Sequence, residues 1–134
     1  MSQENVEIVK ANYEAFASRG LDGWMEHFAD DVEYRAPEGS LDDVGPIHGK
    51  TALRAWLQQW IDTFEGFWFE AVEFIDAGED QVVVVERFGG RAKISGIETE
   101  QTEAVVSTIR DGKIARCREF MTRSEALDAV GLRE

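Results

Sequence analysis

The stretch Gln81–Met121 constrains the fold most, because it carries the pattern of three consecutive strands separated by two turns. Its three parts are rich in valine, threonine, isoleucine and aromatic residues, which is typical of strands that pack on at least one face. Arg110-Asp111-Gly112 predicts a three-residue hairpin loop in which Gly112 takes a positive φ, and Ser95-Gly96 predicts the other reversal. We therefore expect three long antiparallel strands joined by two tight turns.

The turns determine which side chains share a face of this sheet. If Ile109 pairs with Lys113, Glu103 lies opposite Glu119. By the same reasoning, the first hairpin places Arg87 opposite Glu103. The face that carries these three charged residues also carries Val83, Val85, Val105, Ser107, Cys117 and Met121. A slip of one residue in either turn would move part of this set to the other face.

The remainder of the chain predicts helices before these strands and one short helix after them. Apolar residues at helical spacing indicate helices at residues 2–18, 21–28, 49–63 and 125–130, and strands are expected at 32–36 and 67–77. Residues 38–48 are rich in glycine, proline and charge and predict a surface flap. This order predicts one α+β domain, residues 1–134, in which a cone-shaped, curved antiparallel sheet wraps around three N-terminal helices.

The charge and composition of the chain exclude several classes of partner. The formal net charge of −13 would repel a nucleic-acid backbone or an anionic membrane. No apolar run approaches membrane-spanning length, and the polar N-terminus does not predict a signal peptide. The single cysteine, Cys117, cannot form an intrachain disulfide, which fits a reducing compartment. We expect a cytoplasmic protein that binds neither nucleic acid nor membranes.

Several local strings resemble the SnoaL-like group of the nuclear transport factor 2-like superfamily. They are Gly20-Leu21-Asp22-Gly23-Trp24, Phe28-Ala29-Asp30-Asp31-Val32, His48-Gly49-Lys50-Thr51-Ala52-Leu53, Arg110-Asp111-Gly112-Lys113-Ile114 and Glu125-Ala126-Leu127-Asp128-Ala129-Val130-Gly131-Leu132. The resemblance covers nearly the whole chain and implies the same cone-shaped fold, paired as a homodimer. The superfamily includes isomerases, cyclases, epoxide hydrolases, dehydratases and non-catalytic modules, so the fold alone does not choose a function.

Comparison with the activities of this superfamily narrows the chemistry. Ketosteroid isomerases use a tyrosine and a protonated aspartate as an oxyanion hole, and a second aspartate as the base. Tyr13 matches the tyrosine, but Ala36 and Val105 stand at the two acid positions, which argues against that isomerase activity. SnoaL-like cyclases carry an acid on the last strand, which Glu119 matches, and a nearby histidine, which this chain does not match.

The candidate catalytic set is Glu119, Glu103, Arg87 and Tyr13. Two carboxyl groups close together in an apolar cup acquire separated pKa values and can act as acid and base. We expect Glu119 to exchange the proton, with Glu103 and Arg87 tuning it and Tyr13 donating a hydrogen bond. The acid–arginine–acid set also resembles that of limonene-type epoxide hydrolases. Two alternative interpretations are a purely structural salt-bridge network and a tyrosine that only belongs to the apolar stripe of its helix.

The candidate ligand contacts are aromatic and apolar residues of the same cup: Trp24, Tyr34, Trp56, Trp60, Val85, Val105, Cys117 and Met121. An aromatic stripe at helical spacing also fits a plain core, and Cys117 fits a packed thiol better than a nucleophile. His27 and His48 are not placed to share a metal ion, so no metal and no cofactor are expected.

The opposite face of the sheet predicts a partner. It carries Val82, Val84, Phe88, Ala104, Val106, Thr108 and Ala115, and no helix is left to cover it. An exposed apolar face promotes association, so we expect a homodimer packed through this outer face.

These observations predict a protein with an apolar pocket for a small hydrophobic molecule. If it is an enzyme, we expect a cofactor-independent acid–base catalyst similar to the polyketide cyclases, a lyase or isomerase. The alternatives are a hydrolase similar to limonene-type epoxide hydrolases and a non-catalytic module for ligand binding or dimerisation.

Overall fold

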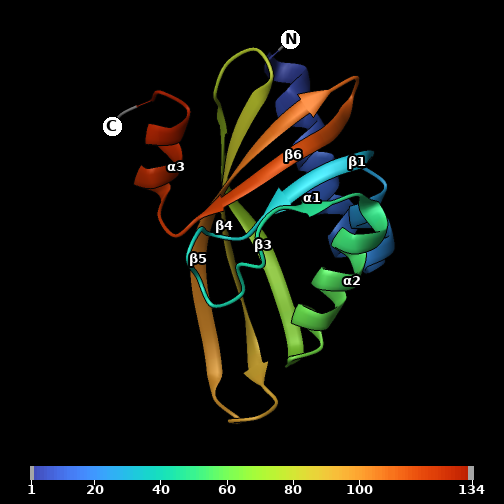
Figure 1. Ribbon diagram of the computed structural model, residues 1–134, viewed down its shortest axis with the longest axis vertical. Coiled ribbons are helices and arrows are strands. Elements are labelled where there is room, and N and C mark those ends of the chain that lie inside the picture. Colours follow the sequence, from blue (N-terminus) through green and yellow to red (C-terminus); the bar gives the residue numbers. More distant parts are fainter. Residues whose placement is uncertain (1, 133–134) are drawn as a thin grey trace.

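A computed structural model describes residues 2–132 of the chain (Figure 1). Its elements follow in the order α1 (Ser2–Met25), β1 (Phe28–Arg35), β2 (Ile47–His48), α2 (Lys50–Ile61), β3 (Phe64–Asp76), β4 (Gln81–Ala92), β5 (Glu98–Arg110), β6 (Lys113–Phe120) and α3 (Arg123–Ala129). The six strands form one sheet in the order β2-β1-β6-β5-β4-β3, in which only the pair β1–β6 is parallel.

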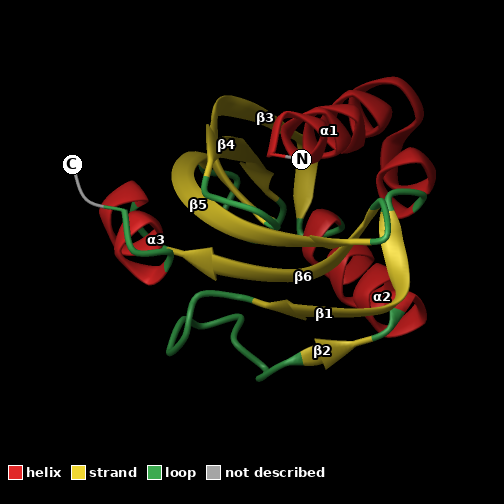
Figure 2. Ribbon diagram, turned by 90° about the horizontal axis from the view of Figure 1, so that it is seen from above, coloured by secondary structure: helices red, strands yellow, loops and turns green. Residues whose placement is uncertain are grey.

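The sheet is strongly curved, and its two faces are covered by different helices. Helices α1 and α2 lie against the concave face, whereas α3 lies on the other side (Figure 2). The main core fills the space inside the curve, where Val9, Val32, Leu53 and Val84 are fully buried. The expected α+β cone is therefore confirmed.

The first two expected helices form one element with a kink. Gly20 interrupts α1 with φ 65° and ψ −147°, a backbone conformation that favours glycine, and the chain resumes the helix after it. Asn12, which is 1% exposed, donates a hydrogen bond of 2.9 Å from Nδ2 to the carbonyl of Trp24 across the kink. This bond fixes the position of the last turn of α1.

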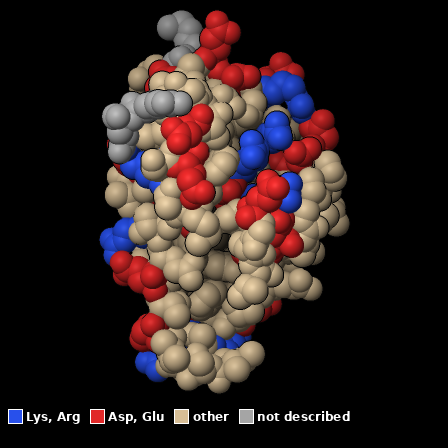
Figure 3. Space-filling model, turned by 60° about the vertical axis from the view of Figure 1, so that its left-hand side comes forward, with Lys and Arg blue, Asp and Glu red and all other residues tan. Residues whose placement is uncertain are grey.

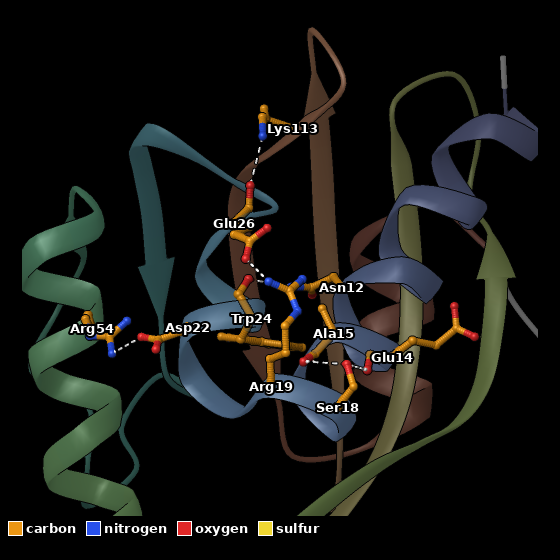
Figure 4. A network of polar contacts seen from close by, with 10 residues as sticks. All are labelled: Asn12, Glu14, Ala15, Ser18, Arg19, Asp22, Trp24, Glu26, Arg54 and Lys113. Atoms are coloured by element: carbon orange, nitrogen blue, oxygen red, sulfur yellow. Dashed lines mark hydrogen bonds and ion pairs between the residues drawn. The ribbon is translucent and has the colours of Figure 1, made fainter.

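Ion pairs on the surface tie the same turn to its neighbours (Figure 4). Arg19 pairs with Glu26 just beyond the end of α1, and Arg54 of α2 pairs with Asp22. Lys113 donates a 2.8 Å hydrogen bond from Nζ to the carbonyl of Glu26. The kinked end of α1 is thereby joined to both α2 and β6.

The hairpin between β5 and β6 is tighter than expected, but its faces are as predicted. Asp111 and Gly112 form a two-residue loop with φ values of 52° and 76°, the positive values that a type I′ turn requires. An irregularity after Thr108 then places Val105 opposite Glu119, two residues from the predicted pairing. A shift of two residues preserves the face of every side chain, so Glu103 and Glu119 both point to the concave side.

The hairpin between β4 and β5 differs from the prediction by one residue. Glu86 lies opposite Glu103, and Arg87 lies opposite Thr102. The predicted turn was centred on a residue, whereas the actual ladder is centred between Ile94 and Ser95. All side chains of β4 are therefore on the opposite face from the one predicted, because the side-chain period of a strand is two residues.

The outer face of the sheet is not bare, contrary to the prediction. Ala126 and Leu127 of α3 pack on Val83, Ala104 and Val106 and bury them. The one-residue slip also moves three residues that were expected on this face, Val82, Val84 and Phe88, to the concave side.

No helix within residues 2–132 combines the length and the apolar character needed to cross a membrane.

Candidate active site

A cavity lies between the concave face of the sheet and helices α1 and α2, with a volume of about 60 Å³. Most of its wall is aromatic or aliphatic: Phe16, Leu21, Trp24, Tyr34, Trp56, Leu57, Trp60, Ile61, Phe67, Phe69 and Phe88. The other four lining residues are acidic: Asp42, Glu86, Glu103 and Glu119. An apolar cavity with a few convergent polar groups is the common form of a small-molecule site.

Glu119 projects from β6 into this cavity and is held by a tyrosine of the neighbouring strand. The hydroxyl of Tyr34 donates a 2.7 Å hydrogen bond to Oε2 of Glu119. Burial raises the pKa of Glu119 well above its usual range, and the negative charges of Glu103 and Glu86 raise it further, while the hydrogen bond from Tyr34 acts in the opposite direction. Glu119 therefore holds a proton at a pH where an exposed glutamate is ionised.

Glu86 on β4 is the most deeply buried acid of the site, at 7% exposure. Burial raises its pKa to about 8, with a further contribution from the charge of Glu103, and a hydrogen bond from Tyr13 partly offsets both. The pKa of Tyr13 is itself raised well above its ordinary value, chiefly by burial and next by Glu86, so its hydroxyl stays protonated and can donate. In the structure, Tyr13 therefore donates its hydrogen bond to Glu86, beside the cavity wall.

Glu103 lies directly opposite Glu86 on β5, which brings two acidic side chains together on one face of the sheet. Like charges directly opposite each other on neighbouring strands repel, and this favours the protonated form of one of them. Burial raises the pKa of Glu103 to about 7, and the charge of Asp42 adds to the effect. The three glutamates can thus include a proton donor and a proton acceptor near neutral pH.

Asp42 belongs to the loop between β1 and β2, which is folded around Asp43. Arg35 donates hydrogen bonds of 3.3 and 3.2 Å to the two oxygens of Asp43, and the backbone N–H groups of Gly39 and Gly45 each donate one of 2.9 Å. These bonds hold the pKa of Asp43 well below its usual range, so the carboxylate stays charged and the loop stays pinned. The pinned loop places Asp42 at the cavity.

The aromatic residues expected at the site line the cavity. Trp24 comes from the kinked end of α1, where its ring contacts Phe69 edge to face with centroids 4.9 Å apart. The rings of Tyr34 and Trp56 lie 5.8 Å apart, and Trp60 contacts Phe88 at 5.0 Å. Their role as ligand contacts stays a prediction.

Arg87 is not part of this site, and the predicted acid–arginine–acid row is wrong. Its side chain lies on the outer face, where it pairs with Glu70 at 3.2 Å and with Glu100 at 2.6 Å. The guanidinium also lies 5.7 Å from the centre of the Trp68 ring. The cause is the register of the β4–β5 hairpin, which turns Glu86 inward in place of Arg87.

The remaining expected contacts are distributed around the cavity. Val85 follows Arg87 to the outer face, for the same reason. Val105 and Cys117 lie in the main core on the concave side, behind the cavity wall. Burial raises the pKa of the Cys117 thiol to about 12, which makes it a packed thiol at neutral pH.

Met121 lies at a second hollow on the other side of Glu119. It is 55% exposed, and the hollow, of about 230 Å³, is also lined by Arg35, Arg118 and Glu125. Glu119 lines this hollow as well as the cavity.

The sequence shows Glu86 as a charged residue within a strand, but which face it occupies cannot be decided without the pairing register of β4 and β5. Glu86 and Arg87 follow a run of four valines, so alternation of apolar and polar residues could not decide which of the two charged residues points inward. Phe67 and Phe69 of β3 were also missed as lining residues, although their spacing of two places them on one face of the strand.

Comparison with known proteins shows the family to which this chain belongs. The model of the SnoaL-like domain matches residues 9–117, and the chain belongs to that family, within the nuclear transport factor 2-like superfamily. An uncharacterised protein of Mycobacterium tuberculosis, Rv0034, is 29% identical over 126 residues, which span 93% of this chain and 94% of the relative.

Solved structures share the fold at lower identity. A nuclear transport factor 2-like protein from Burkholderia pseudomallei has a TM-score of 0.76 at 22% identity, covering 95% of this chain and 97% of its own. Rv0760c from Mycobacterium tuberculosis, in complex with estradiol-17β-hemisuccinate, has a TM-score of 0.73 at 17% identity, covering 90% and 95%. A Catenulispora acidiphila protein with a ketosteroid isomerase-like fold, in complex with trimethylamine, has a TM-score of 0.71 at 20% identity, covering 94% and 93%.

Proposed function

We propose that the cavity binds a small, largely apolar organic molecule and catalyses proton transfer on it without a cofactor, as a lyase or isomerase similar to the polyketide cyclases. The observation that carries the proposal is the group of three glutamates with raised pKa values in an aromatic cavity. The binding of small molecules by proteins of the same fold supports it. The epoxide hydrolase alternative is not proposed, because Arg87 lies outside the cavity.

The proposed chemistry uses two of the carboxyl groups at a time. Glu103, with a pKa of about 7, is partly ionised at neutral pH and accepts a proton from a carbon next to a carbonyl group. Glu119 keeps its proton and gives it to the carbonyl oxygen, so that an enol forms and the total charge of the site is unchanged. If Glu103 then returns its proton to a different carbon and the enol returns its proton to Glu119, an isomer forms. If the enol instead expels a leaving group, which takes the proton from Glu103, the reaction is an elimination. Tyr34 holds Glu119 in position by its 2.7 Å bond.

A substrate panel tests this proposal. Apolar ketones and aldehydes are screened for a rise in melting temperature, since a ligand of the folded state stabilises it. Bound compounds are then followed by NMR in D₂O for exchange of the proton next to the carbonyl. We expect Glu119→Gln and Glu103→Gln to slow exchange by about 100-fold or more. Glu65→Gln, an exposed change on β3, is the matched control and should leave the rate unchanged. Binding without exchange in the wild type would leave a non-catalytic binding module.

We further propose that a second copy of the chain covers the part of the outer face that α3 leaves open. Figure 3 shows this side of the molecule, where uncharged side chains cover much of the lower half. Val72 of β3 is 56% exposed, and Trp68 is half-buried beside Arg87. Light scattering after size exclusion should give the mass of a dimer for the wild type and of a monomer for Val72→Lys. A monomeric wild type would contradict this proposal.

We also propose a cytoplasmic location, which the unpaired and buried thiol of Cys117 supports. Recovery of the native protein from a periplasmic or extracellular fraction of its source cells would contradict it.

A further inference from the structure

The charge of the cavity wall is one-sided. Four of its lining residues are acidic, and no lysine, arginine or histidine is among those that the structure describes. They come from four different places: Glu86 from β4, Glu103 from β5, Glu119 from β6 and Asp42 from the β1–β2 loop. The tyrosines beside them, Tyr13 and Tyr34, are neutral donors. Within residues 2–132, the cavity wall therefore supplies hydroxyl groups to these acids but no cation.

Such an arrangement is costly without a positive partner. A carboxylate in an apolar cavity lacks most of the hydration that it has in water, and a second one nearby adds repulsion. The outer face shows the alternative, because there Arg87 lies between Glu70 and Glu100. Inside the cavity, Glu86 is nine-tenths buried, faces the empty space and has only a hydroxyl as partner. A ligand that brings its own positive charge would take the place of the missing arginine.

The shape of the site favours an organic cation over a metal ion. Within residues 2–132, no three acidic, histidine or cysteine side chains converge closely enough to hold a metal. The rest of the wall consists of aromatic rings, and Trp24, Trp56 and Trp60 are of the type that binds ammonium groups best. Rings around the apolar substituents and carboxylates around the nitrogen would satisfy both parts of an amine.

We propose that the cavity takes a small protonated amine with apolar substituents, its nitrogen lying among Glu86, Glu103 and Glu119 and its substituents against the tryptophans. This inference rests on the proposed binding function of the cavity and names the class of ligand. Binding of the amine would also change the protonation of the cavity acids. Approach of the cation lowers their pKa values, so the glutamates that hold protons in the empty cavity release them on binding.

Calorimetry with three matched compounds tests the proposal. Benzylamine, benzyl alcohol and benzoate have similar shapes and carry positive, zero and negative charge at neutral pH. Isobutylamine and cyclohexylamine extend the amines to other shapes. We expect at least one amine to bind roughly tenfold or more tightly than the alcohol with the same carbon skeleton. Benzoate should not bind. Titration in two buffers of different ionisation enthalpy should show that protons are released when the amine binds.

Variants locate the cation. Glu86→Gln and Glu103→Gln should each weaken amine binding roughly tenfold and reduce the number of protons released, while binding of benzyl alcohol stays the same. Glu65→Gln, on the exposed side of β3, should change neither. Circular dichroism of each variant checks that it is folded, and Asp42→Asn offers a cavity variant on a loop, outside the sheet.

The outcomes separate this inference from the proposed function. If the alcohol or benzoate binds as tightly as the amine, or if amine binding releases no proton, the inference is overturned. If no amine binds while apolar ketones stabilise the protein, the inference fails and the proposed function stands. If neither amines nor ketones bind, both fail.

Discussion

The two faces of β4 stabilise their acidic side chains in opposite ways. On the outer face, Glu70 and Glu100 share the guanidinium of Arg87, in contact with water. On the concave face, one residue away in the sequence, Glu86 lies against Glu103 without a cation and is stabilised by taking up a proton. Surface acids can thus remain charged at little cost, whereas acids in an apolar cavity change their protonation state. The second condition is the one that acid–base chemistry requires.

The largest expected effect is a pH dependence of the free energy of unfolding that comes from the concave face and not from the outer face. Glu86 keeps its proton in the folded protein up to a pKa of about 8, whereas an unfolded chain releases it near ~4.3. Between these values the folded state binds more protons, so the free energy of unfolding falls as pH rises. For this group the total loss is about 5 kcal/mol. Glu86→Gln should remove this part of the pH dependence.

Urea unfolding of the wild type and Glu86→Gln, near about pH 5 and about pH 8, measures the difference. The matched control, Glu65→Gln, should keep the pH dependence of the wild type. An unchanged slope in Glu86→Gln would show that Glu86 is ionised in the folded state.

A smaller effect is expected from the donor to Glu119. Tyr34→Phe removes the 2.7 Å hydrogen bond and leaves a buried carboxyl oxygen without its partner. The free energy of unfolding should fall by about 1–2 kcal/mol. Because that bond lowers the pKa of Glu119, its loss should raise the pKa further. Carboxyl carbon NMR over a pH series reads the shift, and a lower pKa in the variant would contradict the assigned role of Tyr34.

A further variant tests the loop that brings Asp42 to the cavity. Asp42→Asn removes a negative charge that raises the pKa values of Glu103 and Glu119. Both values should therefore move down toward that of an ordinary glutamate, while stability changes little, because Asp43 still pins the loop. The same NMR titration measures both groups. If neither pKa moves, Asp42 does not face the cavity in solution.

The smallest effect is expected on the outer face. Arg87→Gln breaks two exposed ion pairs, which water and salt already screen. We expect no resolvable change in the urea midpoint at physiological salt and no change in the titration of the cavity glutamates. A shift in that titration would place Arg87 near the cavity after all and restore the register predicted from the sequence.

The sequence predicted the fold well, because its evidence was redundant. Helical stripes, strand runs, turn residues and the SnoaL-like strings all indicated the same cone. The aromatic residues at helical spacing in α2 also contribute Trp56 and Trp60 to the cavity, as expected. The faces of Glu103 and Glu119 were also correct, since the error in their hairpin was two residues.

The part of the site on β4 could not be predicted in this way. Which β4 side chains point into the cavity depends on whether the loop before β5 contains an odd or an even number of residues. Ser95-Gly96 marks the position of the turn but does not determine that number. The role of α3 was missed for a different reason. A short amphipathic helix at the end of a chain shows which of its sides is apolar, but not which surface it meets.

The four valines before Glu86 have a consequence for how such a protein could change. Val82 to Val85 are all buried, two on each side of the sheet, so the strand can be turned over without exposing an apolar residue or burying a polar one in that segment. Beyond the valines, Glu86 would leave the interior as Arg87 enters it, and Phe88 would turn to the outer face. Insertion or deletion of one residue in the distant hairpin tip is thus a route, available to evolution or to an engineer, for placing a guanidinium among the remaining acids of the binding chamber, Asp42, Glu103 and Glu119, without substituting any of its residues.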